Sequence, residues 1–263
     1  MELDRRSFLA LLPLTAALAQ GQKTAVSYPA GVSHKQADEL VLANHILANE
    51  GVLDAYGHVS VRDETNPGRF LLARHLPASV VTASDLLVYD LDTKPIGDPK
   101  ATGYSERFIH GEIYKARPDV MSVIHTHSPD VIPFTVTSVP LRPMIHMGGF
   151  IPQNVPVFEI RDTGGDNTDM LIRNNELGHA LAAKLGKGPL VLLRGHGAVV
   201  AGPSLHVTVG WSYYLGVDAR AEQQALMLGG GKATFLNPSE SQNATMQDGF
   251  ERAWTFFKSR VQK

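Results

Sequence analysis

Helical and strand-like patterns alternate along most of the chain. The predicted helices, recognised by apolar residues at helical spacing, cover residues 34–50, 105–116, 129–138, 174–185, 205–228 and 239–258. The predicted strands, which are apolar or alternate with polar positions, cover 59–61, 70–72, 86–91, 120–127, 156–160, 189–193 and 198–201. The last helix carries Phe250, Trp254 and Phe257 at helical spacing, which indicates packing or subunit contact. Because these segments are interleaved without a linker, we expect one α/β domain over residues 34–263.

The first nineteen residues have the layout of an export signal. Arg5 and Arg6 precede an apolar run from residue 8 to 18, and a small-x-small site follows at 17–19. The run is too short to span a bilayer and lacks the polar face of an amphipathic helix. Because the double arginine resembles a twin-arginine signal, we expect residues 1–19 to direct export to a bacterial periplasm. Residues 20–33 are polar, contain Gly and Pro, and are expected to form an N-terminal arm.

Composition excludes several classes of protein. The chain has 263 residues, of which 43% are hydrophobic and 19% charged, so it is neither disordered nor collagen-like. The 24 Lys and Arg against 26 Asp and Glu give no basic surface of the kind that binds nucleic acid. Eleven histidines accompany no cysteine, so any metal must be held by imidazole and carboxylate groups. The glycine-rich nucleotide loops and the GxSxG motif are absent from the sequence.

Three histidines are candidate metal ligands. His125 and His127 stand two residues apart at the end of a predicted strand, so their side chains share one face. With eleven histidines such a pair also arises by chance. His196 lies between two glycines, which allow close backbone approach, although a histidine there can simply be part of a hairpin turn. Together the three imidazoles would leave an open coordination position, as in catalytic rather than structural sites.

Glu106 opens the predicted helix over 105–116. An acidic residue in a first turn usually interacts with the helix dipole. If its carboxylate instead faces the metal, it can act as a displaceable ligand and as a proton carrier.

Four motifs in order resemble the class II aldolase/adducin family. They are Gly57-His58-Val59-Ser60-Val61-Arg62, Ser105-Glu106-Arg107-Phe108-Ile109-His110, the stretch from Arg117-Pro118-Asp119 to His125-Thr126-His127, and Gly195-His196-Gly197. The resemblance spans roughly residues 35–230. It implies a three-layer α/β/α domain with a central mainly antiparallel or mixed sheet, and a homotetramer whose active site lies between subunits. It also implies that His125, His127, His196 and Glu106 bind one divalent metal per subunit, which could be Zn, Mn, Co or Fe.

The sequence departs from the sugar-phosphate aldolases of this family where they bind phosphate. The positions that carry Asn, a Thr-Gly pair and two Ser in those enzymes hold His58, Ala73-Arg74 and Tyr104-Ser105 here. Met147 stands where a catalytic tyrosine is expected next to His146. We therefore expect a substrate without phosphate.

The remaining motifs resemble the branch of the family that decarboxylates hydroxylated aromatic carboxylates. On this resemblance Glu106, with His58, would deliver a proton, and Arg74 would hold a carboxylate through its planar guanidinium group. Tyr104, Ser105 and His146 are further candidates for the substrate pocket. Two alternatives stay open, namely a retro-aldol lyase acting on a non-phosphorylated hydroxy-carbonyl compound and a non-catalytic adducin-like module. The expected partner is a small molecule, with no nucleic acid and no membrane after signal cleavage.

Overall fold

The computed structural model describes residues 26–262 apart from residue 99 and residues 245–247. The predicted export signal over 1–19 lies outside the described residues, as does the first part of the predicted arm. In the described part of the arm, the ring of Tyr28 stacks on His34, and the carbonyl of Gly31 accepts a hydrogen bond of 2.5 Å from Arg69. This part of the arm therefore packs against the domain.

One eight-stranded sheet, in the order β4-β3-β2-β1-β5-β8-β7-β6, runs through the described residues. Neighbouring strands are antiparallel except for the parallel pair β6 and β7. The strands are β1 (His58–Arg62), β2 (Arg69–Ala73), β3 (Leu86–Asp90), β4 (Pro95–Ile96), β5 (Ser122–Thr126), β6 (Val157–Phe158), β7 (Leu190–Leu193) and β8 (Gly197–Gly202). The predicted mixed, mainly antiparallel sheet is confirmed, although β6 is shorter than the predicted strand.

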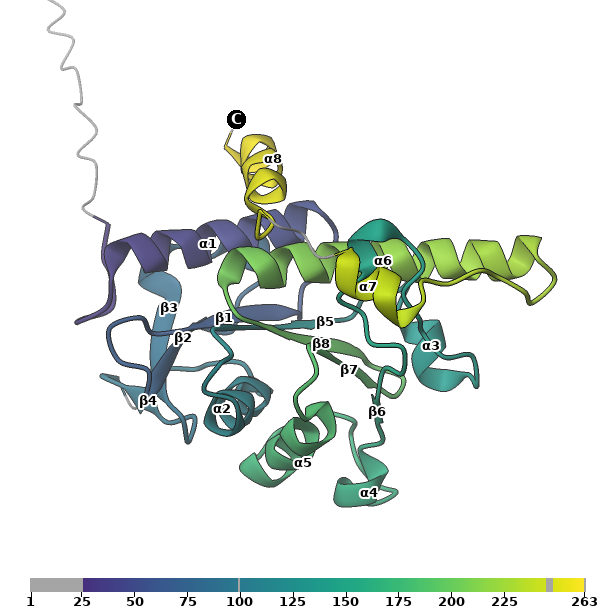
Figure 1. Ribbon diagram of the computed structural model, residues 1–263. Coiled ribbons are helices and arrows are strands. Elements are labelled where there is room, and N and C mark those ends of the chain that lie inside the picture. Colours follow the sequence, from purple (N-terminus) through teal and green to yellow (C-terminus); the bar gives the residue numbers. More distant parts are fainter. Residues whose placement is uncertain (1–25, 99, 245–247, 263) are drawn as a thin grey trace, which may run out of the picture.

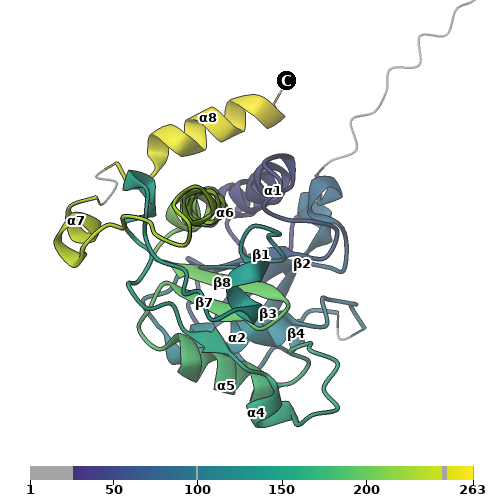
Figure 2. The ribbon, with the colours of Figure 1, turned by 90° about the vertical axis from the view of Figure 1, so that its right-hand side faces the viewer.

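Helices cover both faces of this sheet. The helices are α1 (His34–Asn49), α2 (Arg107–Ala116), α3 (Ile132–Val136), α4 (Arg161–Gly164), α5 (Asn175–Leu185), α6 (Leu205–Leu228), α7 (Pro238–Asn243) and α8 (Glu251–Val261). Figure 1 shows α1, α6 and α8 on one side of the sheet and α2, α4 and α5 on the other, and Figure 2 shows the same three layers from the side. The predicted α/β/α arrangement is thereby confirmed. Within the described residues, no helix combines the length and the apolar character needed to cross a membrane.

The predicted helix over 239–258 is wrong, because the structure has two short helices there. Pro238 begins α7 behind a capping box formed by Asn237 and Glu240. Phe250 then adopts a left-handed backbone conformation with φ 66°, which an α-helix cannot continue. Its ring lies against Gly210 of α6, where an added Cβ would stand 2.4 Å from the ring. Packing against α6 therefore outweighs the helical spacing of the three aromatic residues.

Strand β1 carries two kinds of side chain on its two faces. Val59 and Val61 belong to the apolar core, whereas His58, Ser60 and Arg62 face the α2 side, as a period of two requires. Arg62 donates hydrogen bonds of 2.7 and 2.9 Å to the carbonyls of Tyr114 and Arg117 at the end of α2. Because these carbonyls lack helical partners, Arg62 satisfies them and fixes α2 against β1.

Candidate metal centre and active site

Three histidines converge at one end of two neighbouring strands. His125 is in β5, His127 directly follows this strand, and His196 lies in the turn between β7 and β8. The Nε2 atom of His127 is 3.0 Å from Nε2 of His125 and 3.1 Å from Nε2 of His196. The shared face predicted for His125 and His127 therefore exists, and the pairing of β5 with β8 brings the third imidazole beside them.

The second ring nitrogen, Nδ1, of these histidines forms hydrogen bonds with oxygen atoms. The Nδ1 atom of His125 is 3.1 Å from the carbonyl of Ala198, and Nδ1 of His127 is 3.1 Å from both carboxylate oxygens of Asp54. Burial lowers the pKa of His196, and the backbone of Met170 opposes this shift, as a carbonyl that accepts the ring proton does. Because carbonyl and carboxylate oxygens only accept hydrogen bonds, each Nδ1 carries the proton. All three Nε2 atoms therefore present lone pairs to one another, which is the tautomer that metal ligation needs.

Glu106 completes the cluster. It precedes α2 directly, its side chain is buried, and its Oε2 atom lies 3.6 Å from Nε2 of His125 and 3.7 Å from Nε2 of His196. The Oε1 atom accepts a hydrogen bond of 2.9 Å from the backbone N–H of Ile172. Burial by itself would raise the pKa of Glu106, but the hydrogen bond and charge of His125, with His196 and the Ile172 N–H, lower it to about 2. The carboxylate is therefore ionised at neutral pH.

The four side chains fit a divalent transition metal. Their ligand atoms all lie within 4.8 Å of one another. An ion at the Zn–N distance of about 2.0 Å in tetrahedral geometry separates its nitrogen ligands by roughly 3.3 Å, close to the spacings observed here. Three neutral imidazoles and one carboxylate suit Zn, Mn, Co or Fe, and the donor set does not choose among them. Without an ion, the lone pairs of the three Nε2 atoms face one another with no donor between them, so the cluster is built for a cation.

The predicted residues His58, Tyr104 and Ser105 line one cavity with this cluster. The cavity has a volume of about 320 Å³, and its remaining lining residues are Tyr56, His75, Glu106, His127, Leu171, Gly195 and His196. The hydroxyl of Tyr104 donates to the carbonyl of Leu76, and burial raises its pKa to about 12. Tyr104 therefore contributes a flat wall 4.6 Å from the ring of His58 rather than an acidic proton.

Arg74 and His146 are not among the residues that line this cavity. The Nε atom of Arg74 forms an ion pair of 2.6 Å with Asp85. His146 is exposed at the start of a short 3-10 helix over His146–Gly148. The structure thus separates these two residues from the cluster within one chain, and their role in substrate binding stays a prediction.

Three residues near the site were missed by sequence reasoning. Asp54 orients His127 and also accepts hydrogen bonds of 2.9 Å from the backbone N–H groups of Tyr56 and Gly57. Tyr56 and His75 line the cavity. The available signal was the Asp-x-Tyr-Gly sequence just before the first motif, since an aspartate commonly binds the backbone two residues further on.

The glycines on either side of His196 allow the close backbone approach that the sequence predicts. A Cβ at Gly197 would stand 2.0 Å from the carbonyl oxygen of Thr126, so only glycine lets β8 approach β5 this closely. Gly195 has φ 63°, a conformation that favours glycine. The turn can therefore direct the imidazole of His196 toward β5.

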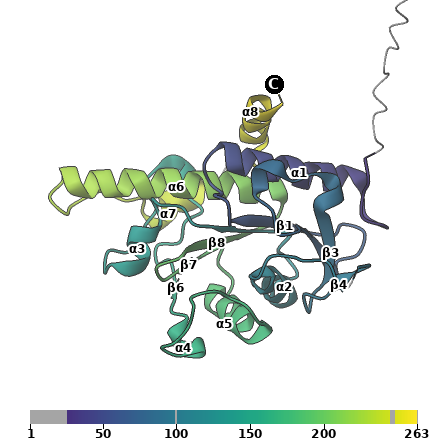
Figure 3. The same cartoon turned by 180° about the vertical axis from the view of Figure 1, so that it is seen from behind.

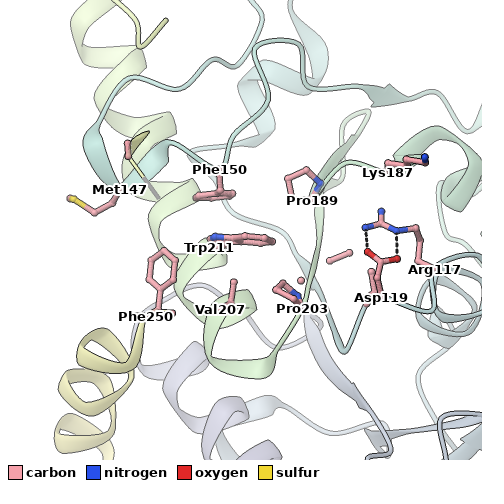
Figure 4. Close-up of a pocket in the computed structure, with 15 residues that line it drawn as sticks. Arg117, Asp119, Met147, Phe150, Lys187, Pro189, Pro203, Val207, Trp211 and Phe250 are labelled. Carbon is pink, nitrogen blue, oxygen red and sulfur yellow. Dashed lines mark hydrogen bonds and ion pairs between the residues drawn. The ribbon is translucent and has the colours of Figure 1, made fainter. Parts of the chain in front are cut away.

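A larger cavity, of about 510 Å³, lies at the opposite ends of the same strands. Pro189, just before β7, and Pro203, just after β8, lie on its wall (Figure 4). His196 is in the turn that joins these strands at their other ends. The rings of Phe150 and Trp211 stack there with centroids 5.1 Å apart. None of the four candidate ligands lines this larger cavity, so the chemistry belongs to the smaller one.

The fold and the site together define a class of protein: a three-layer α/β domain with three histidines and one glutamate at the end of its central sheet. The chain belongs to the class II aldolase and adducin family, since the family model described as "Class II Aldolase and Adducin N-terminal domain" matches residues 38–222. The four candidate ligands all lie inside this range.

Individual proteins agree with this assignment. The chain is 38% identical over 206 residues to the decarboxylase tropJ of Talaromyces stipitatus, covering 74% of this chain and 77% of tropJ. It is 32% identical over 196 residues to a 3,4-dihydroxyphthalate decarboxylase of Arthrobacter keyseri, covering 68% and 74% of the two chains. A solved aldolase II superfamily protein from Pseudomonas syringae has the same fold, with a TM-score of 0.73, 23% identity and coverage of 88% and 94%. The predicted family is thus confirmed, and its named relatives agree with a metal-dependent lyase.

Proposed function

We propose that this protein is a metal-dependent lyase that removes CO₂ from a hydroxylated aromatic carboxylate. The observation that carries the proposal is the cluster of three Nε2 atoms and the Glu106 carboxylate beside a cavity with flat walls. Two relatives that are 38% and 32% identical to this chain over the aligned residues are named decarboxylases, and one of these names specifies a dihydroxyphthalate.

The shape of the cavity supports an aromatic substrate. Four of its lining side chains, those of Tyr56, His58, His75 and Tyr104, end in flat rings that can lie against a planar ligand. The positions where the sugar-phosphate aldolases of the family carry phosphate-binding Asn and Ser residues hold His58 and Tyr104-Ser105 on the wall of this cavity. A planar hydroxy-carboxylate therefore suits the cavity better than a sugar phosphate.

The residues of the site can supply the proton that decarboxylation needs. A metal held by His125, His127 and His196 would bind the ring hydroxyl and adjacent carboxylate and stabilise negative charge on oxygen. The Glu106 carboxylate, ionised because its pKa is about 2, would accept the hydroxyl proton when substrate binds. It would then return this proton to the ring carbon as the bond to the departing CO₂ breaks. The product would leave this step as a phenolate that takes one proton from water, so the overall reaction consumes one proton for each CO₂ released.

The test is CO₂ release by purified protein loaded separately with Zn, Mn, Co or Fe(II). Substrates would be 3,4-dihydroxyphthalate and other aromatic carboxylates with a neighbouring hydroxyl, with benzoate as the control that lacks the hydroxyl. We expect CO₂ from at least one hydroxylated compound with at least one metal, none from benzoate, and none after chelation. Absence of CO₂ from every combination would reject the proposal.

The aldolase alternative has a distinct signature. A retro-aldol lyase would release an aldehyde or ketone from a non-phosphorylated hydroxy-carbonyl compound and would form no CO₂. Among the solved structures, the fold alone supports this alternative, because an L-fuculose 1-phosphate aldolase from Glaciozyma antarctica resembles this chain at only 22% identity. An adducin-like module, in contrast, would bind no metal after gentle purification. The convergence of three unprotonated Nε2 atoms argues against such a module.

We also propose that four copies of the chain form a ring with the active site between subunits. Helix α6 extends beyond the sheet (Figure 3), and near its end Met227 and Leu228 are 82% and 90% exposed. Exposed apolar residues on a projecting helix are suited to a subunit contact. Light scattering after size-exclusion chromatography should give the mass of four chains, and the mass of a single chain would reject the tetramer.

Export to the periplasm is a separate proposal. It rests on the twin arginine and the apolar run in residues 1–19. Replacement of both Arg5 and Arg6 with Lys should keep the protein in the cytoplasmic fraction of a bacterial host, whereas the unchanged chain should appear in the periplasmic fraction. Equal distribution of the two proteins would contradict the proposal.

A further inference from the structure

A chain of four buried polar groups runs from the active-site cavity into the protein. His58 and Ser60 are two residues apart on β1, and His110 and Tyr114 are four apart on α2, so each pair shares one face. The Nδ1 atom of His58 is 2.7 Å from Nε2 of His110, whose Nδ1 atom is 2.6 Å from the Ser60 hydroxyl. The Ser60 hydroxyl is in turn 2.7 Å from that of Tyr114. None of the four residues is more than 1% exposed.

The far end of this chain determines the direction of its hydrogen bonds. Among the described residues, Ser60 Oγ is the one acceptor placed at hydrogen-bond distance from the Tyr114 hydroxyl. The backbone of Val123 also meets the Tyr114 oxygen and lowers its pKa against the larger effect of burial, as a donating N–H does. Because a buried donor without an acceptor costs about 1–3 kcal/mol, the Tyr114 proton must point to Ser60.

The remaining protons then follow one by one. Ser60 accepts from Tyr114, so its own proton goes to Nδ1 of His110. A neutral His110 that accepts at Nδ1 carries its proton on Nε2 and donates it to Nδ1 of His58. His58 in turn carries its proton on Nε2, the ring nitrogen left for the cavity that His58 lines. The reverse direction would leave the proton of Tyr114 without an acceptor.

We propose that Ser60, His110 and Tyr114 are positioning residues that fix His58 as the Nε2–H tautomer, a neutral hydrogen-bond donor to an anionic oxygen of the substrate. The identity of that oxygen, on a hydroxylated aromatic carboxylate, rests on the proposed function. The direction of the hydrogen bonds does not.

This assignment separates His58 from the three candidate metal ligands. His125, His127 and His196 carry their protons on Nδ1 and present lone pairs, whereas His58 presents an N–H group. His58 therefore cannot act as a fourth imidazole ligand. Burial lowers the pKa values of both His58 and His110, the latter to about 3, so both rings are neutral, as the chain of hydrogen bonds requires.

Neutron diffraction from deuterium-exchanged crystals tests the direction without any substrate. We expect deuterium on Nε2 of both His58 and His110 and none on Nδ1 of either ring. Deuterium on Nδ1 of His58 would overturn the proposal. Because this measurement needs no turnover, failure of the decarboxylation assay together with the expected map would reject only the proposed function.

Substitutions test whether the direction matters for catalysis. Ser60→Ala removes the one donor that the described residues place at Nδ1 of His110, so His58 can take either tautomer. We expect kcat to fall about 10- to 100-fold with KM changed less than threefold. Ser122→Ala is the matched control, because Ser122 is an equally buried serine on the neighbouring strand β5. Its hydroxyl donates to the Ser60 carbonyl at 2.9 Å and takes no part in the hydrogen bonds between His58, His110, Ser60 and Tyr114. We expect Ser122→Ala to keep kcat within about threefold.

A third variant distinguishes the effect of the hydrogen-bond direction from the effect of losing a buried hydroxyl group. Tyr114→Phe removes the proton that fixes the direction but keeps Ser60 as a possible donor to His110. We therefore expect a smaller loss of kcat than in Ser60→Ala, and deuterium shared between Nδ1 and Nε2 of His58. Thermal unfolding of each variant establishes that it is folded. Equal losses of kcat in Ser60→Ala and Ser122→Ala would overturn the proposal, because they would indicate a purely structural effect.

Discussion

Asp54 offers a sharp test of the metal site, because it touches the cluster only through His127. Its two carboxylate oxygens are both 3.1 Å from Nδ1 of His127, and its Oδ1 atom also accepts from two backbone N–H groups at 2.9 Å. Asp54→Asn keeps an oxygen for these contacts and removes the negative charge. The substitution therefore changes the basicity of His127 more than its position.

The expected magnitude follows from this geometry. A hydrogen bond to a charged acceptor is worth roughly twice one to a neutral acceptor, a difference of about 1–2 kcal/mol. Loss of a partner that orients a metal-ligating histidine typically weakens metal binding about 10- to 100-fold. Since the Asp54 side chain is 51% exposed, water screens its charge, and we expect a weakening near the lower end, about tenfold.

The assay is competition for Zn²⁺ between the protein and a chromophoric chelator, which yields the dissociation constant of each variant. Asp119→Asn is the matched control, because Asp119 is also a partly exposed aspartate in an ion pair, 2.6 Å from Arg117, beside the larger cavity at the other strand ends. Its affinity for Zn²⁺ should equal that of the unchanged protein. An Asp54→Asn protein that binds Zn²⁺ within twofold of the unchanged protein would refute the argument that Asp54 supports His127 as a ligand.

Three further predictions concern the ligands, the metal and a buried carboxylate. His196→Ala should lose both the bound metal and turnover, whereas Glu106→Gln should lose turnover and keep much of the metal. Metal analysis and the CO₂ assay measure these two properties. Full activity of His196→Ala would contradict the assignment of the metal site. Chelation should lower the melting temperature by about 8–16 °C, because an ion present at 1,000 times its dissociation constant adds about 4 kcal/mol; an unchanged melting curve would argue against a bound ion. Burial raises the pKa of Glu222 on α6 to about 7, so the folded state keeps a proton that the unfolded chain releases near pH 4.5. Stability should therefore fall by about 2 kcal/mol between pH 4.5 and 7 through this residue, and denaturant unfolding of Glu222→Gln should show a weaker pH dependence.

Most of the fold could be predicted because its elements bury one face at a regular period. The helices over α1, α2, α5 and α6 and the hairpin of β7 and β8 follow directly from apolar spacing and from their flanking Gly and Pro residues. The prediction failed at α7 and α8, where the position of Phe250 depends on a contact with Gly210, forty residues away in the sequence. A local pattern cannot contain that information.

The candidate site could likewise be predicted only in part from the sequence. His125 and His127 follow from strand periodicity, and His196 was marked by its glycines, but the distance between β5 and the β7–β8 turn follows only from the order of strands in the sheet. Arg74 is a candidate for carboxylate binding from its chemistry, and its ion pair with Asp85 could not be predicted from the sequence. Asp54 was missed because nothing in the sequence around it indicates a contact with His127, seventy-three residues away.

The sheet explains why histidines with opposite tautomers can lie side by side at the candidate active site. His58 and His125 are directly paired residues on the adjacent strands β1 and β5, with ring centroids 5.2 Å apart, so both side chains point to the same face. His125 binds the carbonyl of Ala198 on β8, which can only accept, whereas His58 binds His110 on α2, which donates. One strand therefore presents a lone pair for a metal and its neighbour an N–H for an anion. Because both tautomers are set by buried partners outside the cavity, the two roles are in place before substrate binds.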